Sequence, residues 1–219
     1  MANTIKPLSF NGVNAYLIQA PSGYFLIDTG FSKNRQQIET ELQKAGCTIG
    51  TLKLIILTHG DFDHSGNAAY LHQKCAAPVA MHPLDAGMVE SGDMFSNRGV
   101  NAPTKLFGKL VLVLLRSTLK KEDRFKPDIS LEDNYSFAGF GLDAKVICIP
   151  GHSKGSIGVL TKDGDLFCGD LLQNTKRPEK GSLIVDKAAF EDSLLKLRGL
   201  HISRVYPGHG KDFLMEQVT

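Results

Sequence analysis

Four side chains that can bind a metal ion lie within six positions of this 219-residue sequence, at His59, Asp61, Asp63 and His64. Carboxylates and imidazoles in one set suit zinc, iron or manganese better than calcium or magnesium. The apolar run 52–57 precedes this set, and residues 66–73 can form a helix after it. We therefore expect a metal-binding turn between a strand and a helix, from which these side chains project off the end of a sheet.

Three later segments repeat one pattern, in which an apolar strand stops at a glycine and a histidine or aspartate follows directly. The glycine permits the sharp backbone path that leaves the next side chain exposed. The residues placed in this way are His152, Asp170 and His209. The other histidines, at positions 72, 82 and 201, do not follow strands, and we interpret them as surface or structural residues. The repetition strengthens the prediction of a metal centre.

This ordered set resembles the metallo-β-lactamase fold superfamily, whose characteristic loop is His-x-His-x-Asp-His. Here the loop is 59–64, with Asp61 in place of the second histidine of the family. Segments 14–18 and 25–30 are similar to the family's opening hairpin, so the resemblance covers nearly the whole chain. It implies that Asp28 braces the metal loop without itself binding metal.

The resemblance also implies two divalent metal ions and a ligand set for each. One ion would be bound by His59, Asp61 and His152. The other would be bound by Asp63, His64 and His209, with Asp170 bridging both ions. Zinc is the first expectation, and iron or manganese are the alternatives. A carboxylate at Asp61 adds negative charge that a histidine would not, which favours these harder ions.

The order of apolar segments predicts two strand-rich halves, each with helices on one side. The first half has expected strands near 5–10, 13–19, 24–28, 52–57 and 78–81, and helices near 34–45 and 66–73. The second has expected strands near 144–149, 157–161, 165–168 and 202–206, and a helix near 187–198. Such halves pack most simply as face-to-face sheets with helices outside. The resemblance implies a four-layer αββα sandwich of the α/β (α+β) class, with the metals in the cleft between the halves.

Composition predicts one domain over residues 1–219, because 42% of the chain is hydrophobic and no linker-like stretch divides it. Lysine and arginine number 25 against 23 acidic residues, so the net charge gives no reason to expect a nucleic acid or a membrane as partner. Four cysteines without paired spacing indicate reduced thiols. The first residues contain no apolar signal segment, so we expect a cytoplasmic protein.

The function implied by the resemblance is that of a dinuclear metallohydrolase acting on a small molecule. A metal-bound hydroxide would attack an ester, thioester, lactone or related bond, and Asp63 would orient it and accept its proton. Two alternatives stay open. Asp61 also fits a di-iron redox protein related to the flavodiiron reductases, although the chain has no room for their flavodoxin-like domain. A non-catalytic metal-binding scaffold is the second alternative.

Substrate choice is expected to depend on the long connection 84–132, which lies between the two halves. We predict a helical insert there that acts as a lid, packs on the sandwich or forms a homodimer contact. Within it, Phe107 and Leu110 are candidate substrate-binding residues. The basic pair Lys176 and Arg177 follows the predicted ligands and could contact an anionic group of the substrate.

Overall fold

The computed structural model describes residues 3–98, 106 and 119–218. Its first sheet has six strands, which lie in sequence order from one edge to the other. They are β1 (Thr4–Phe10), β2 (Val13–Ala20), β3 (Gly23–Ile27), β4 (Leu52–Ile56), β5 (Val79–Met81) and β6 (Ile129–Ser130). The first three strands form an antiparallel meander, and β3 to β6 pair in parallel.

The second sheet has five strands in the order β13-β12-β9-β8-β7. They are β7 (Ala144–Cys148), β8 (Ile157–Thr161), β9 (Asp165–Gly169), β12 (Arg204–Pro207) and β13 (Phe213–Leu214). Only β9 and β12 pair in parallel, and the other neighbours are antiparallel. A separate two-stranded ribbon consists of β10 (Leu172–Gln173) and β11 (Glu179–Lys180).

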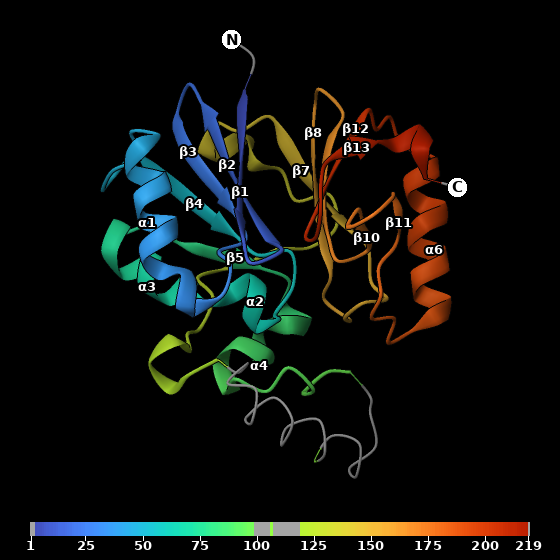
Figure 1. Ribbon diagram of the computed structural model, residues 1–219, viewed down its shortest axis with the longest axis horizontal. Coiled ribbons are helices and arrows are strands. Elements are labelled where there is room, and N and C mark those ends of the chain that lie inside the picture. Colours follow the sequence, from blue (N-terminus) through green and yellow to red (C-terminus); the bar gives the residue numbers. More distant parts are fainter. Residues whose placement is uncertain (1–2, 99–105, 107–118, 219) are drawn as a thin grey trace.

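Five α-helices occur in the described part of the chain: α1 (Arg35–Lys44), α2 (Phe62–Ser65), α3 (Ala68–Cys75), α4 (Pro83–Ser91) and α6 (Lys187–Arg198). Helices α1 and α3 lie on the outer side of the first sheet, and α6 lies on the outer side of the second (Figure 1). Among the described residues, no helix has the length and apolar character needed to cross a bilayer.

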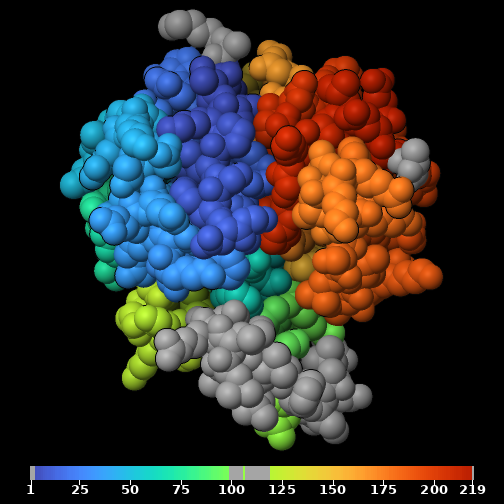
Figure 2. Space-filling view, viewed as in Figure 1, coloured from blue at the N-terminus to red at the C-terminus, as the bar shows by residue number. Residues whose placement is uncertain are grey.

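Three layers of buried side chains separate these four layers of secondary structure. Successive side chains of β2 point to opposite faces of the first sheet, so this strand contributes to two of these layers. Leu17 packs with the residues on the α1 and α3 side, while Tyr16 and Ile18 pack between the two sheets. On the far side, Leu166 of β9 packs with Phe190 of α6. The expected αββα sandwich is therefore confirmed. Figure 2 shows the strands of the first half, in blue, meeting the red and orange second half along a seam.

One helix differs from its predicted bounds. The sequence predicts a helix over 66–73, but the chain already coils at Phe62, inside the metal loop, and breaks between α2 and α3. The Asn67 side chain explains the break, because its Nδ2 donates to the backbone oxygens of Thr29 and Phe31, both at 2.8 Å. These long-range hydrogen bonds override the local helix propensity.

The connection 84–132, predicted to contain a helical insert that acts as a lid, packs on the sandwich or forms a homodimer contact, is described at residues 84–98, 106 and 119–132. Its described part begins within α4 and ends in β6, which extends the first sheet by one edge strand. This connection is therefore integrated into the fold at both ends. Its central residues, where the predicted helix lies, are outside the described residues.

Candidate metal centre

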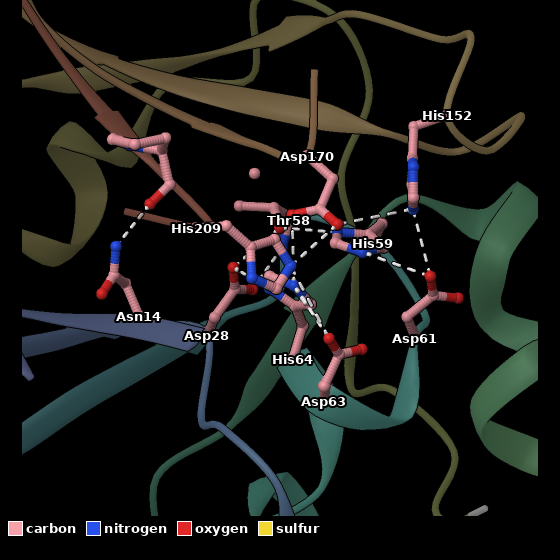
Figure 3. Close-up of polar contacts among 12 residues, drawn as sticks. Asn14, Asp28, Thr58, His59, Asp61, Asp63, His64, His152, Asp170 and His209 are labelled. Carbon is pink, nitrogen blue, oxygen red and sulfur yellow. Dashed lines mark hydrogen bonds and ion pairs between the residues drawn. The ribbon is translucent and has the colours of Figure 1, made fainter. Parts of the chain in front are cut away.

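The seven predicted ligand side chains lie together at one end of the two sheets (Figure 3). Strands β7, β9 and β12 run in the same direction, so the residues that follow their carboxyl ends meet at one edge. Strand β4 of the first sheet ends beside them, where the Ile157 amide donates to the Thr58 carbonyl oxygen at 2.8 Å. The topology therefore brings together ligands from four distant segments of the sequence.

The ligand atoms form three overlapping groups, and the atoms of each group lie within 4.8 Å of one another. These groups are His59, Asp61 and His152; His59, His64 and Asp170; and Asp63, His64 and His209. Asp170 connects them, because its carboxylate lies 3.2 Å from Nε2 of both His64 and His209. Its Oδ2 also lies 3.9 Å from His152 Nε2. Ligands bound tetrahedrally at about 2.1 Å would lie roughly 3.4 Å apart, so the spacing suits metal ions.

All four histidines of the cluster are oriented through the nitrogen that faces away from it. Each Nδ1 lies 2.9 Å from an oxygen, and the partners are Thr58 Oγ1 for His59, Asp28 Oδ2 for His64, Leu183 O for His152 and Gly12 O for His209. All four oxygens accept a hydrogen bond from Nδ1. The carbonyl and carboxylate oxygens can only accept, and the Thr58 hydroxyl accepts because its own proton is donated to Asp28. In the neutral ring every Nε2 therefore presents a lone pair to the centre of the cluster, as a metal ligand must.

Several polar atoms of the cluster are buried without a hydrogen-bond partner among the described residues. They are His59 Nε2, His64 Nε2, Asp61 Oδ1 and Asp170 Oδ1. Buried polar atoms usually have partners, so a group of unpartnered acceptors at one point indicates a ligand that they share. Four acceptors with no donor between them fit divalent cations.

The carboxylates and imidazoles of the cluster shift one another's pKa values, as expected for acidic and basic side chains packed at one site. Burial would raise the pKa of Asp170, but the positive charge of His64 and the imidazoles of His209 and His64 beside the carboxylate outweigh burial and hold this pKa well below its ordinary value. Burial likewise opposes a raised pKa at His64, yet the carboxylates of Asp170, Asp63 and Asp28 raise it well above the usual value. A metal ion must therefore displace protons from these histidines when it binds.

Asp28 connects the end of β3 to the metal loop. Its Oδ1 accepts from the Thr58 amide at 2.9 Å, and its Oδ2 accepts from the Thr58 hydroxyl at 2.8 Å and from His64 Nδ1 at 2.9 Å. Its φ of 56° lies in the left-handed region, which aspartate tolerates better than most residues. These three bonds fix both the entry to the loop and the ring of one candidate ligand.

The loop that carries His209 is held by the first sheet. Asn14 Nδ2 donates to Pro207 O at 3.0 Å and to Gly210 O at 2.7 Å, and its amide donates to Gly208 O at 2.8 Å. Gly208 has no room for a side chain, because a Cβ there would lie 2.2 Å from Asp170 Oδ1. The Asn14 contacts therefore set the position of His209 relative to the bridging carboxylate. The sequence placed Asn14 in the opening hairpin without assigning it this role.

Asp85 is a second residue whose role was missed. It lies in the first turn of α4 and is fully buried. Its Oδ2 accepts from the Gly60 amide at 3.0 Å and the Ser153 hydroxyl at 2.6 Å. Its Oδ1 accepts from the Gly155 amide at 2.8 Å and from the Asn97 side chain. Asp85 thereby joins the loop of His59 to the loop of His152. In the sequence it resembles an ordinary acidic residue of a first helical turn.

Arg98 is the third residue that was missed. It is 4% exposed, and its Nη2 lies 2.7 Å from Asp61 Oδ2 and 3.1 Å from His152 Nε2. No sequence motif surrounds it. The connection 84–132, for which the sequence suggested a role in substrate choice, packing or dimer contact, thus places a cation in direct contact with two candidate ligands.

The candidate substrate residues remain predictions. Phe107 and Leu110 lie outside the described residues. Lys176 and Arg177 are exposed in the turn between β10 and β11, and Arg177 Nε lies 3.9 Å from Glu179 Oε2. Within the described ranges, neither forms a hydrogen bond or ion pair with the ligand cluster.

Comparisons with known proteins agree with this fold. A family model described as the Metallo-beta-lactamase superfamily matches residues 8–209. The chain is 26% identical to the Probable metallo-hydrolase YflN of Bacillus subtilis, over 95% of this chain and 84% of that protein. It is 26% identical to the Acyl-coenzyme A thioesterase MBLAC2 of Bos taurus, over 96% of this chain and 77% of that one. The crystal structure of TTHA1623 in a di-iron-bound form superposes with a TM-score of 0.74 and 28% identity, covering 98% and 96% of the two chains.

Proposed function

The chain belongs to the metallo-β-lactamase superfamily, and from that premise we propose that it is a hydrolase of ester, thioester or lactone bonds that requires two divalent metal ions. The observation that carries this proposal is the convergence of four imidazole lone pairs and three carboxylates on one point. Their unpartnered buried acceptors support metal binding as the purpose of the cluster.

The proposed ligand sets follow the groups seen in the structure. The first subsite consists of His59, Asp61 and His152. The second subsite consists of Asp63, His64 and His209. Asp170 is proposed to bridge them, because its carboxylate lies near histidines of both sets. Asp28, Asn14 and Asp85 position the ligands through hydrogen bonds to their loops.

The substrate is proposed to approach from the side of the second subsite. Side chains of Asp63 and His209 are 17% and 25% exposed, whereas those of Asp61 and His152 are 5% and 2% exposed. Divalent ions bound here would lower the pKa of a water molecule and polarise the carbonyl group of the substrate. Asp63 is the accessible carboxylate closest to that approach, so we assign to it the orientation of the attacking water and acceptance of its proton.

Two metal ions per chain are expected in the purified protein. Zinc should compete with iron and manganese, because Asp61 gives the first subsite more negative charge than a histidine would. The di-iron form of the similar protein TTHA1623 supports iron as a candidate. Elemental analysis of protein from unsupplemented medium, followed by reconstitution with each metal, measures the number and identity of the bound ions. Absence of bound metal together with no uptake would contradict the proposal.

A di-iron redox protein is the competing function, and Asp61 and the di-iron relative are the observations in its favour. A screen of thioesters, lactones and activated esters under anaerobic conditions without reductant separates the two. Hydrolysis under these conditions supports the proposal, and the relative MBLAC2, an acyl-coenzyme A thioesterase, makes thioesters the first substrates to try. Reductant-dependent consumption of oxygen or nitric oxide without hydrolysis would favour the redox function.

Asp61→His is expected to shift metal preference toward zinc, because it replaces a hard carboxylate with an imidazole. The structure adds that this change leaves Arg98 without its carboxylate partner, so Asp61→His should be compared with the double variant Asp61→His/Arg98→Met. Competition between zinc and manganese, measured by elemental analysis, reports the preference. If both variants select metals as the unaltered protein does, the charge argument is wrong.

A further inference from the structure

We propose that Arg98 is a tethered cation that competes with a metal ion for the first subsite, so that the two subsites bind metal with unequal affinity. The inference rests on the proposed function, because it presupposes two metal subsites. It concerns a residue for which the ligand pattern of the sequence gave no role. Its consequence is that the second subsite fills first.

Contacts of the guanidinium coincide with those that a metal would make. Arg98 Nη2 contacts Asp61 Oδ2 at 2.7 Å and His152 Nε2 at 3.1 Å, which are two of the three ligand atoms of the first subsite. Those two atoms lie 3.1 Å from each other. One positively charged group therefore already satisfies most of this subsite.

The contact with His152 cannot coexist with metal coordination by the same ring. His152 Nδ1 lies 2.9 Å from Leu183 O, a carbonyl oxygen that only accepts, so the ring proton is on Nδ1. Nε2 then has one lone pair, which either accepts a hydrogen bond from Arg98 or binds a metal ion. Metal binding at this subsite must therefore displace the guanidinium from His152.

The position of Arg98 is supported by its neighbours in the chain. Asn97 donates through Nδ2 to Leu84 O at 2.8 Å and also to Asp85, the carboxylate that joins the two ligand loops. The side chain of Arg98 is 1% exposed, and its Nε and Nη1 have no partner among the described residues. A buried guanidinium depends strongly on a carboxylate partner such as Asp61, which raises the cost of displacing it.

In the part of the chain that the structure describes, the second subsite has no comparable competitor. Among residues 3–98 and 119–218, no lysine or arginine forms an ion pair with Asp63 or Asp170, whose partners are histidines. A metal ion that binds Asp63, His64 and His209 therefore displaces no guanidinium or ammonium group of the described residues. Of the lysines and arginines in the described ranges, Arg98 alone forms a hydrogen bond or ion pair with a proposed ligand.

Metal titration of the apoprotein in the presence of a competing chelator tests the proposal, with zinc as the probe. The unaltered protein should bind one zinc ion tightly and a second more weakly. Arg98→Met keeps the length of the side chain and removes its charge, and it should tighten the weaker site roughly ten- to a hundredfold, the value of a charged hydrogen bond. The tighter site should not change. Arg35→Met is the matched control, because it removes an equal charge from an ion pair with Asp123 outside the centre.

The possible outcomes separate this inference from the function on which it rests. Two equally tight zinc ions in the unaltered protein, or an Arg98→Met variant whose weaker site is unchanged or weaker still, would overturn the role of Arg98 and leave the hydrolase proposal standing. No zinc binding by any variant would overturn both. If circular dichroism shows that Arg98→Met is unfolded, Arg98→Gln replaces it, with the same tightening expected.

Discussion

Asp63→Ala is expected to lower kcat/KM for hydrolysis by roughly 10²–10⁴-fold, the usual effect of losing a general base. The variant also loses one proposed ligand of the second subsite, so its metal content should fall. Asp63 is 17% exposed in its side chain and lies in the first turn of α2, so the fold should tolerate alanine. The measurement is the rate on the best substrate of the anaerobic screen, together with elemental analysis.

A second substitution at the same position separates the two roles of Asp63. Asp63→Asn keeps an oxygen that can bind metal but cannot accept a proton at neutral pH. Loss of activity with both metal ions retained would identify proton acceptance as the role. Asp143→Ala is the matched control, because Asp143 is an exposed carboxylate that pairs with Lys162 at the surface. If Asp63→Ala has the activity of this control, Asp63 takes no part in the reaction.

The clustering of the candidate ligands could be predicted because each candidate position depends on a short local pattern. A strand that ends at a glycine followed by His152, Asp170 or His209 is visible within a few residues, and parallel strand direction then brings such ends together. The sheets were also predictable, because short continuous apolar runs are typical of strands that are buried on both faces. Local sequence patterns were therefore sufficient to predict the four layers of the sandwich.

Residues that act through distant partners could not be predicted in this way. Asp85 receives hydrogen bonds from Gly60 and Gly155, which lie 25 and 70 positions away. Arg98 contacts His152 across 54 positions. No pattern of a single sequence carries such pairings. The two-residue strand β6 was missed for a related reason, since its length is too short to show any period.

Asp85→Ala is expected to destabilise the protein more than any other substitution proposed for this chain. The carboxylate is fully buried and accepts four hydrogen bonds, so alanine leaves several buried donors without a partner. At about 1–3 kcal/mol for each unsatisfied donor, and allowing for relaxation, the free energy of unfolding should fall by about 3–5 kcal/mol. For a chain of this size, that corresponds to a Tm lower by roughly 10 °C or more.

Thermal unfolding should be followed both in metal-free protein and with metal bound, because bound metal stabilises the native state by mass action. Asp85→Asn retains the shape of the side chain but presents an NH₂ group to donors on one side. Its Tm should therefore lie between those of the Asp85→Ala variant and the unaltered protein. The exposed Asp143→Ala again serves as the control.

A further result distinguishes a positioning role from general stability. Asp85 connects the loop of His59 to the loop of His152, and both histidines belong to the proposed first subsite. Its removal should therefore weaken zinc binding there more than at Asp63, His64 and His209, even at temperatures where the variant is fully folded. Equal weakening at both subsites would show that Asp85 stabilises the fold without aligning the ligands, and an unchanged Tm would contradict its structural role altogether.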